Sequence, residues 1–361
     1  MSLLDLVRPS LRDVAAYAVP SDRAMVKLDA NESACPLSEE ARRKLGDALA
    51  AVDGRRYPDP RAEKVRALVA KQLGARPEEL VLGSGSDEII ALLSTALSAP
   101  RAGSTTSCIL VPTPTFVMYK VTATAHGMRT VEVPLTRDFE LDVPAMQTSI
   151  TAERPHIVYF ATPNNPTGNA YDQASMQTLI RANVDTLFVI DEAYAAYQGF
   201  SLASWFDDFP NLAIMGTLSK VGFAAARVGW IRLPLSLAQE VDKARQPFNL
   251  NAYAQVVAEL ALTEFAPEIG QHIKVLTQER ERLMTGLLSL PNISPYQSAA
   301  NFIFAETVHD ADRVQHSLKG HGILIRSFHK HGGVLSNKVR ITVGTPSENE
   351  RLLQALPIAL R

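Results

Sequence analysis

Short apolar runs alternate with longer amphipathic stretches through the middle of the chain. Four runs of four or five residues end in polar residues and are typical of buried strands: 108–111, 156–160, 187–190 and 212–215. A further strand is expected at 79–82, before a glycine-rich turn and an amphipathic helix with Ile89, Ile90, Leu93 and Leu97 on one face. Short strands with helices between them predict an α/β protein whose mostly parallel sheet is covered by helices.

The pattern changes near residue 247. A long helical stretch is expected over 252–288, followed by strands around 301–304 and 339–343 with a helix between them. This second pattern predicts a smaller α+β domain. We therefore expect three parts: an N-terminal arm over 1–30, a large α/β domain over 31–246 and a small C-terminal domain over 247–361.

Composition narrows the class of protein. The 361 residues carry 36 Lys and Arg against 38 Asp and Glu, a formal net charge of −2, which argues against nucleic acid as the main partner. Cys35 and Cys108 form no disulfide framework, which fits a reducing compartment. No apolar run approaches the roughly 18–20 residues of a membrane helix, and residues 1–10 do not read as a secretory signal. We expect a cytoplasmic enzyme without a membrane partner.

Polar side chains follow three successive strands at the point where each strand ends. A loop containing Asn165 follows the strand at 156–160, Asp191 follows the next strand, and Lys220 lies after the third. Ligands of open parallel sheets bind at the carboxyl ends of the strands. The order therefore predicts that an amide, a carboxylate and an amine meet at one edge of the sheet.

Each of these residues also has an ordinary interpretation. Asp191 can cap a helix that begins near Glu192, and a protonated pyridine nitrogen would satisfy its carboxylate equally well. Most lysines lie on the surface, but an amine near apolar walls has a lowered pKa and can form a Schiff base with an aldehyde, which is the alternative for Lys220. Phe116 is either a core aromatic or a face for a flat ring.

Three further features suggest anions. Residues 83–87 (Gly-Ser-Gly-Ser-Asp) precede a helix and match no nucleotide-binding motif; they are either an anion site at a helix N-terminus or a plain cap. Ser219 and Arg227 suit a phosphate. Arg326 and Arg340 lie in apolar strands, where arginine needs a salt bridge or an anionic ligand. His329 and His331 lack the spacing of a known metal site and the carboxylate or cysteine ligands that would complete one, so no metal is expected.

Together these motifs resemble the fold-type I pyridoxal-phosphate-dependent aminotransferases of the class II subfamily. The wider resemblance is carried by residues 85–88 (GSDE), 163–168 (PNNPTG), 191–194 (DEAY) and 217–220 (TLSK). A narrower one, to histidinol-phosphate aminotransferases, is carried by residues 28–32 (LDANE), 56–60 (RYPDP), 83–88 (GSGSDE), 114–119 (PTFVMY), 298–302 (SAANF) and 339–344 (VRITVG). The matching motifs run over nearly the whole chain.

The resemblance implies the cofactor pyridoxal 5'-phosphate, bound as a Schiff base to Lys220, which also moves the proton. It implies that Asp191 pairs with the pyridine nitrogen, that Asn165 and Tyr194 bind the ring oxygen, and that Phe116 stacks on the ring. The implied phosphate site consists of Ser86, Asp87, Thr217, Ser219 and Arg227.

Partners and substrate follow from the same resemblance. Tyr57 would reach the phosphate of the neighbouring subunit, so the active unit is a homodimer whose N-terminal arm packs on the small domain or the partner. Arg340 would take a substrate carboxylate, and Tyr17, Asn31 and Arg326 would hold the far end of the substrate. The implied reaction is reversible amino transfer between histidinol phosphate and 2-oxoglutarate in histidine biosynthesis.

The chain departs from the family pattern at three places. Seven residues separate Lys220 from Arg227 where many relatives have eight, residues 33–36 (SACP) replace an Asn-Pro pattern, and Phe116 stands where tyrosine is common.

Two other enzymes share the motifs: an aminotransferase for aromatic amino acids and a decarboxylase of an amino-acid phosphate. The sensing half of a transcription regulator is a third alternative, but the short stretch before the motifs and the net charge argue against it.

Overall fold

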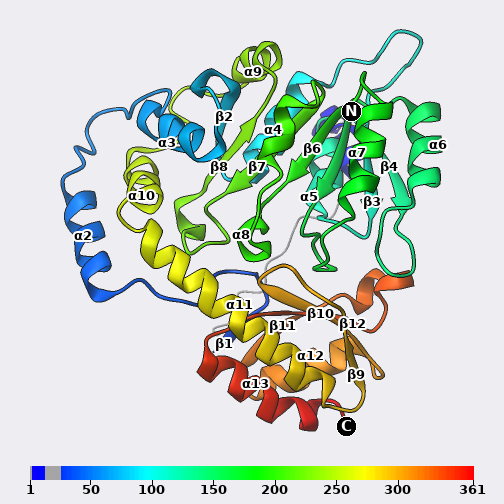
Figure 1. Ribbon diagram of the computed structural model, residues 1–361. Helices are drawn as coiled ribbons and strands as arrows, with labels where there is room; N and C mark the ends of the chain where they lie inside the picture. The colour runs from blue at the N-terminus through cyan, green and yellow to red at the C-terminus, as the bar shows by residue number, and fades with distance from the viewer. Residues whose placement is uncertain (1, 13–25) are drawn as a thin grey trace.

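Seven strands form the larger of two sheets in the computed structural model, which describes residues 2–12 and 26–361 (Figure 1). Their order across the sheet is β2 (Leu80–Ser84), β8 (Val228–Arg232), β7 (Leu212–Thr217), β6 (Leu187–Asp191), β5 (Ile157–Ala161), β3 (Cys108–Thr113) and β4 (Arg129–Pro134). The pairs from β7 to β4 are parallel, and β8 runs antiparallel to both its neighbours. A mostly parallel sheet with helices confirms the predicted fold class.

Helices cover both faces of this sheet. One face packs against α4 (Ser86–Ala96), α5 (Met118–Ala125) and α9 (Leu235–Asp242). The other packs against α6 (Val143–Glu153) and α7 (Gln173–Ala182) at one end, and α3 (Glu63–Leu73) and α10 (Ala252–Leu262) at the other. In β6, Val189 faces the first layer and Ile190 the second, and both are fully buried. Because both faces are covered, the strand is an unbroken apolar run.

A second sheet of five strands forms the lower part of Figure 1. Its order is β1 (Val26–Leu28), β11 (Ile323–Ser327), β12 (Lys338–Thr342), β10 (Phe302–Thr307) and β9 (Ile293–Pro295). It packs with α12 (Ala311–Gly320) and α13 (Pro346–Ala359). Residues 26–28, the end of the expected arm, are thus an edge strand parallel to β11. The division at residues 30 and 246 stays a prediction.

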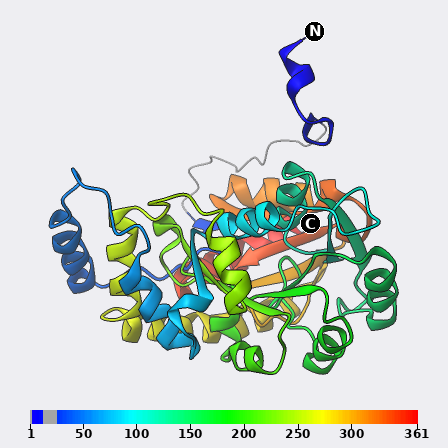
Figure 2. The same ribbon diagram turned by 90° about the horizontal axis from the view of Figure 1, so that it is seen from above.

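Four further α-helices belong to the described part of the chain. They are α1 (Pro9–Arg12), α2 (Glu39–Ala50), α8 (Ala195–Gln198) and α11 (Ala266–Leu288). The C-terminal part of α11 packs into the core of the small sheet. Residues 2–12 project from the rest of the chain in Figure 2, and Arg8 donates a hydrogen bond of 3.0 Å to the carbonyl of Ala125 at the end of α5.

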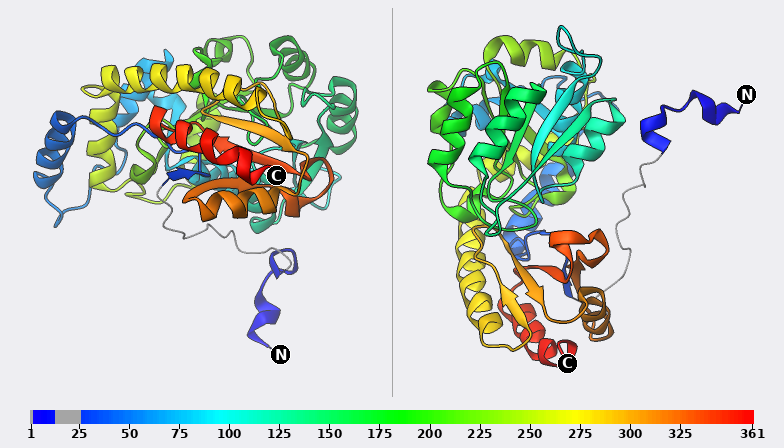
Figure 3. Two further views of the ribbon diagram at one scale, coloured as in Figure 1. Left: turned by 90° about the horizontal axis from the view of Figure 1, so that it is seen from below. Right: turned by 90° about the vertical axis from the view of Figure 1, so that its right-hand side faces the viewer.

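The helical stretch expected over 252–288 is two helices, so that prediction was wrong in its continuity. The first ends at Leu262, and Thr263 leaves the helical conformation at φ −124° and ψ −91°. Pro267 then lies in the first turn of α11. Inside a continuous helix its ring would clash with the carbonyl four residues earlier, whereas a first turn accepts proline. The break lets α11 run from the helices of the large sheet down to the small sheet (Figure 3).

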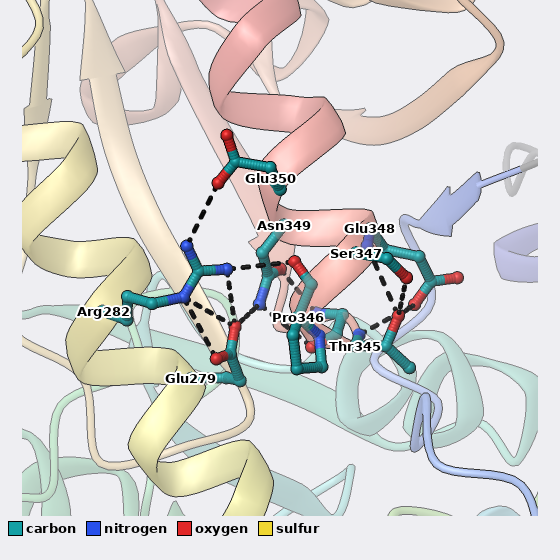
Figure 4. Close-up of polar contacts among 9 residues, drawn as sticks. Glu279, Arg282, Thr345, Pro346, Ser347, Glu348, Asn349 and Glu350 are labelled. Carbon is teal, nitrogen blue, oxygen red and sulfur yellow. Dashed lines mark hydrogen bonds and ion pairs between the residues drawn. The ribbon is translucent and has the colours of Figure 1, made fainter.

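A buried polar network fixes the start of α13 against α11 (Figure 4). The amide of Asn349 donates to Glu279 at 2.9 Å and to the carbonyl of Gly344 at 3.0 Å, and its oxygen accepts from the Gly344 N–H at 2.9 Å. Arg282 also donates to Glu279. Burial raises the pKa of Glu279, but the hydrogen bonds from Arg282 and Asn349 outweigh it and lower the pKa overall. The network holds the chain that leaves β12, the strand that carries Arg340.

Candidate active site

The structure brings thirteen of the residues singled out in the sequence to one cavity of about 190 Å³. They are Asn31, Ser86, Asp87, Phe116, Asn165, Asp191, Tyr194, Thr217, Ser219, Lys220, Arg227, Arg326 and Arg340. Because β5, β6 and β7 are neighbours in the sheet, the segments that follow them carry Asn165, Asp191 and Lys220 to the same edge. The small sheet supplies the two arginines from the opposite side.

Asp191 ends β6 and is 5% exposed. One carboxylate oxygen accepts a hydrogen bond of 2.6 Å from the hydroxyl of Tyr119, and the other accepts one of 3.0 Å from the N–H of Ala193. Burial raises the pKa of Asp191, and these hydrogen bonds partly oppose the rise. The next helix begins only at Ala195, so Asp191 does not cap it. A buried carboxylate at a cavity wall is suited to a protonated nitrogen.

Lys220 reaches into the cavity from the loop after β7. Its Nζ donates to the carbonyl of Ala30 at 3.4 Å and lies 5.8 Å from the centre of the Tyr194 ring. The Tyr194 hydroxyl in turn accepts a hydrogen bond of 3.0 Å from the side chain of Asn31. The other end of that amide accepts from Thr342 at 3.2 Å. Asn31 borders the cavity, and its side chain ties Tyr194 to the small sheet.

One corner of the cavity has the geometry of an anion site. It lies at the N-terminus of α4, whose first-turn N–H groups have no partner within the helix. Gly85 precedes the helix at φ +79°, and a Cβ atom there would lie 2.5 Å from Nη2 of Arg227. Arg227 donates to the carboxylate of Asp87 at 2.8 Å. The Asp87 carboxylate therefore positions the guanidinium, and only the backbone of Asp87 suits an anion.

Two hydroxyl groups complete this corner. Thr217 ends β7, and its Oγ1 donates to the Ser219 hydroxyl at 2.9 Å or to the carbonyl of Val228 at the same distance. The N–H of Ser219 donates to Thr217 at 3.1 Å. Both side chains are buried. Hydroxyls held in this way beside a guanidinium are suited to phosphate oxygens.

Two arginines of the small sheet face the cavity side by side. Arg326 in β11 is the direct cross-strand partner of Arg340 in β12. Like charges opposite each other on one face of a sheet repel, and an anion that contacts both guanidinium groups would reduce this repulsion. Arg340 is buried. It donates a hydrogen bond of 2.5 Å to the side-chain oxygen of Asn165 and one of 2.7 Å to the carbonyl of Asp29. A second cavity of about 570 Å³ adjoins the first, and both are bordered by Phe116, Asn165, Arg326 and Arg340.

One residue of the predicted site, Tyr57, does not border this cavity. Tyr57 is 81% exposed and stacks on Phe248, with 4.5 Å between the ring centres. Tyr17 lies outside the described residues.

His329 and His331 lie in a short 3-10 turn, and the described residues contain no cluster of three or more acidic, histidine or cysteine side chains able to hold a metal. No helix among the described residues is long and apolar enough to cross a membrane.

Sequence reasoning missed two buried residues at the cavity, Tyr119 and Asp29. Asp29 is 7% exposed, burial raises its pKa, and its Oδ1 has no hydrogen-bond partner in the part of the chain that the structure describes. Both residues occur inside motifs that carried the resemblance, but nothing local marks their contacts. Tyr119 touches a carboxylate 72 residues away in the chain.

Comparison with known proteins places the chain in a family. Residues 23–356 match the class I and II aminotransferases. Histidinol-phosphate aminotransferase 1 of Burkholderia lata is 39% identical over 363 residues, which cover 99% of this chain and 98% of that protein.

Two solved structures share the fold. Histidinol-phosphate aminotransferase from Sinorhizobium meliloti, in complex with pyridoxal-5'-phosphate, has a TM-score of 0.86 at 24% identity and covers 98% of this chain and 97% of its own. L-threonine-O-3-phosphate decarboxylase from Porphyromonas gingivalis has a TM-score of 0.79 at 20% identity. The match covers 92% of this chain and 99% of the decarboxylase. The decarboxylase shows that the fold alone does not determine the reaction. The match over residues 23–356 does determine the family, and this chain belongs to the class I and II aminotransferases.

Proposed function

We propose that this chain is a pyridoxal-phosphate-dependent histidinol-phosphate aminotransferase. Its reaction is reversible amino transfer between L-histidinol phosphate and 2-oxoglutarate, which gives imidazole acetol phosphate and glutamate. The observation that carries the proposal is one cavity with a buried carboxylate, an amine, an anion corner and two arginines. The similarity to relatives of that name over nearly the full chain supports the choice of substrate.

The donor set of the cavity fits pyridoxal phosphate. The glycine-lined corner at α4 and Arg227 suits its phosphate, because a side chain at Gly85 would fill the space beside the guanidinium. Phe116 offers a ring face, and Asn165 and Tyr194 offer hydrogen bonds to a ring oxygen. Lys220 is the amine that can bind an aldehyde. When bound, the cofactor supplies a ring that accepts electrons from the substrate carbon that loses its proton.

Asp191, Lys220 and Tyr194 each have a distinct role in the proposed reaction. The carboxylate of Asp191 is suited to keep a ring nitrogen protonated, since burial leaves it in need of a positive partner. The Nζ of Lys220 takes the proton from the substrate carbon that carries the amino group, acting as a general base. It then gives a proton back as a general acid. Tyr194 is held beside Lys220 by Asn31, so its hydroxyl stays in place through both halves of the reaction.

Two substrates with different anions have to use the same site in turn. Glutamate brings carboxylates, and histidinol phosphate brings a phosphate. The neighbouring guanidinium groups of Arg326 and Arg340 can bind either anion with paired hydrogen bonds. The adjoining cavity of about 570 Å³ offers room for the side chain of the substrate beyond Phe116.

We propose further that the active form is a homodimer in the cytoplasm, with Tyr57 acting on the cofactor phosphate of the other subunit. Tyr57 is exposed on the surface and fixed by Phe248 rather than buried in its own subunit, which supports this role. Both cysteines are free thiols, as expected in a reducing compartment.

The test is an amino-transfer assay with purified protein, pyridoxal phosphate, histidinol phosphate and 2-oxoglutarate. We expect glutamate to form in an amount equal to the histidinol phosphate consumed, with no carbon dioxide. Faster glutamate formation from phenylalanine would assign the aromatic reaction instead. Release of carbon dioxide from an amino-acid phosphate would assign a decarboxylase.

A further inference from the structure

Tyr119 lies beneath the candidate active site. It is the second residue of α5, is 0% exposed and borders the cavity. Its hydroxyl donates the 2.6 Å hydrogen bond to Asp191. Its ring stacks on Tyr159 with 4.3 Å between centres and 8° between planes, and meets Phe116 edge to face at 5.5 Å and 88°.

We propose that Tyr119 is a positioning residue that holds the carboxylate of Asp191 in place and in its ionised form for the cofactor nitrogen. This inference rests on the proposed function. The hydroxyl fixes one carboxylate oxygen and the N–H of Ala193 fixes the other, so the carboxylate plane cannot rotate freely. A preorganised partner loses less free energy on binding than a mobile one.

The charge of Asp191 explains why the cavity needs such a donor. Burial favours the neutral acid, and a neutral acid would not hold a protonated ring nitrogen. A donated hydrogen bond favours the carboxylate instead. Burial and the Asp191 charge raise the pKa of Tyr119 well above 10, so its hydroxyl keeps its proton and always donates.

The aromatic contacts fix where the hydroxyl lies. Tyr159 supports one face of the Tyr119 ring, and Phe116, the residue suited to stack on the cofactor, rests against its edge. One side chain therefore sets the carboxylate for the ring nitrogen and supports the aromatic residue for the ring face. The two walls of the cofactor site move together if Tyr119 moves.

Tyr159 supplies a matched control. It is equally buried in the same stack, but its hydroxyl has no hydrogen-bond partner among the described residues. Tyr119→Phe and Tyr159→Phe therefore remove the same atom from adjacent rings, and only the first removes a bond to Asp191. Both keep the ring and its packing, so both variants are expected to fold.

The experiment measures the dissociation constant of pyridoxal phosphate from the apoprotein by equilibrium titration of intrinsic fluorescence. We expect Tyr119→Phe to weaken binding about tenfold, the scale of one hydrogen bond to a charged group, and Tyr159→Phe to change it less than about twofold. In an Asp191→Asn background, Tyr119→Phe should change binding less than about twofold. The acid pH at which affinity falls should lie higher in Tyr119→Phe, because Asp191 then protonates more readily.

Two results would overturn the inference. One is wild-type affinity in Tyr119→Phe; the other is an equal loss with and without Asp191, which would mean that the hydroxyl serves packing alone. A wild-type protein that binds no pyridoxal phosphate would refute the proposed function itself, so the two failures are distinguishable.

Discussion

Arg340 in the small sheet donates a hydrogen bond of 2.5 Å to the side-chain oxygen of Asn165 in the loop after β5. The bond joins a residue suited to bind substrate with one suited to bind cofactor, 175 positions apart in the chain. The same guanidinium donates to the carbonyl of Asp29 at 2.7 Å. These two neutral groups help to orient the forked head of Arg340 without a substrate anion.

Replacement of Arg340 by lysine should separate substrate binding from cofactor binding. An ammonium keeps the charge but cannot reproduce the planar fork that meets Asn165, Asp29 and an anion together. We expect KM for glutamate to rise about 10–100-fold, from the loss of a paired, charge-assisted hydrogen bond, with pyridoxal phosphate affinity changed less than about threefold. Steady-state kinetics and cofactor titration measure both. Arg351→Lys, at an exposed position on α13, is the matched control; unchanged KM in Arg340→Lys would contradict the role.

The glycine before α4 should be required by the phosphate corner. In Gly85→Ala the new Cβ would lie 2.5 Å from Arg227 Nη2 and displace it, so pyridoxal phosphate affinity should fall about tenfold or more. Gly103→Ala is the control, because Gly103 has the same kind of φ, +83°, but nothing within 4 Å of the added atom. Both variants should lose stability, because residues with a Cβ rarely adopt either φ, and Gly85→Ala should lose more, because its ψ of 170° places it in a region that is essentially restricted to glycine. Equal cofactor affinity in the two variants would show that the clash at Arg227 does not matter.

The free energy of unfolding of the apoprotein should depend on pH because Asp191 is a buried carboxylate. Its folded-state pKa is raised above the unfolded value, chiefly by burial. The neutral acid therefore favours the folded state at low pH, and this advantage is lost as pH rises through the folded pKa. Urea unfolding from pH 4 to pH 8 should show wild type losing stability relative to Asp191→Asn as pH rises. A pH-independent difference between wild type and Asp191→Asn would contradict the burial argument.

The network at the start of α13 should support the strand that carries Arg340. Asn349 is fully buried and bonds to Glu279 and to both backbone groups of Gly344. Asn349→Ala leaves these groups unsatisfied and should cost about 3 kcal/mol in the free energy of unfolding. Glu350→Gln, at an exposed site where the carboxylate contacts Arg282 at 3.4 Å and accepts from Gln354 at 3.1 Å, should cost less than about 0.5 kcal/mol. Similar costs in chemical denaturation would show that the network is not structural.

The sequence predicted the parts of the site that depend on strand order. Asn165, Asp191 and Lys220 each follow an apolar strand, and the ends of neighbouring parallel strands lie at one edge. It did not predict contacts between distant side chains. Tyr119 lies between residues that face the core, and only the folded structure sets its hydroxyl against Asp191. The break at Thr263 was missed because helical periodicity continues across it, although Pro267 marks the new first turn.

The central claim is tested most directly by an absorbance titration of the purified protein with pyridoxal phosphate and then with histidinol phosphate. We predict a visible band from cofactor bound through Lys220, absent in Lys220→Ala, that disappears on addition of histidinol phosphate as the amino group passes to the cofactor. Phenylalanine should cause a slower and smaller change. A Lys220-dependent band that histidinol phosphate leaves intact would contradict the proposed substrate, and no such band at all would contradict the cofactor and the catalytic role of Lys220.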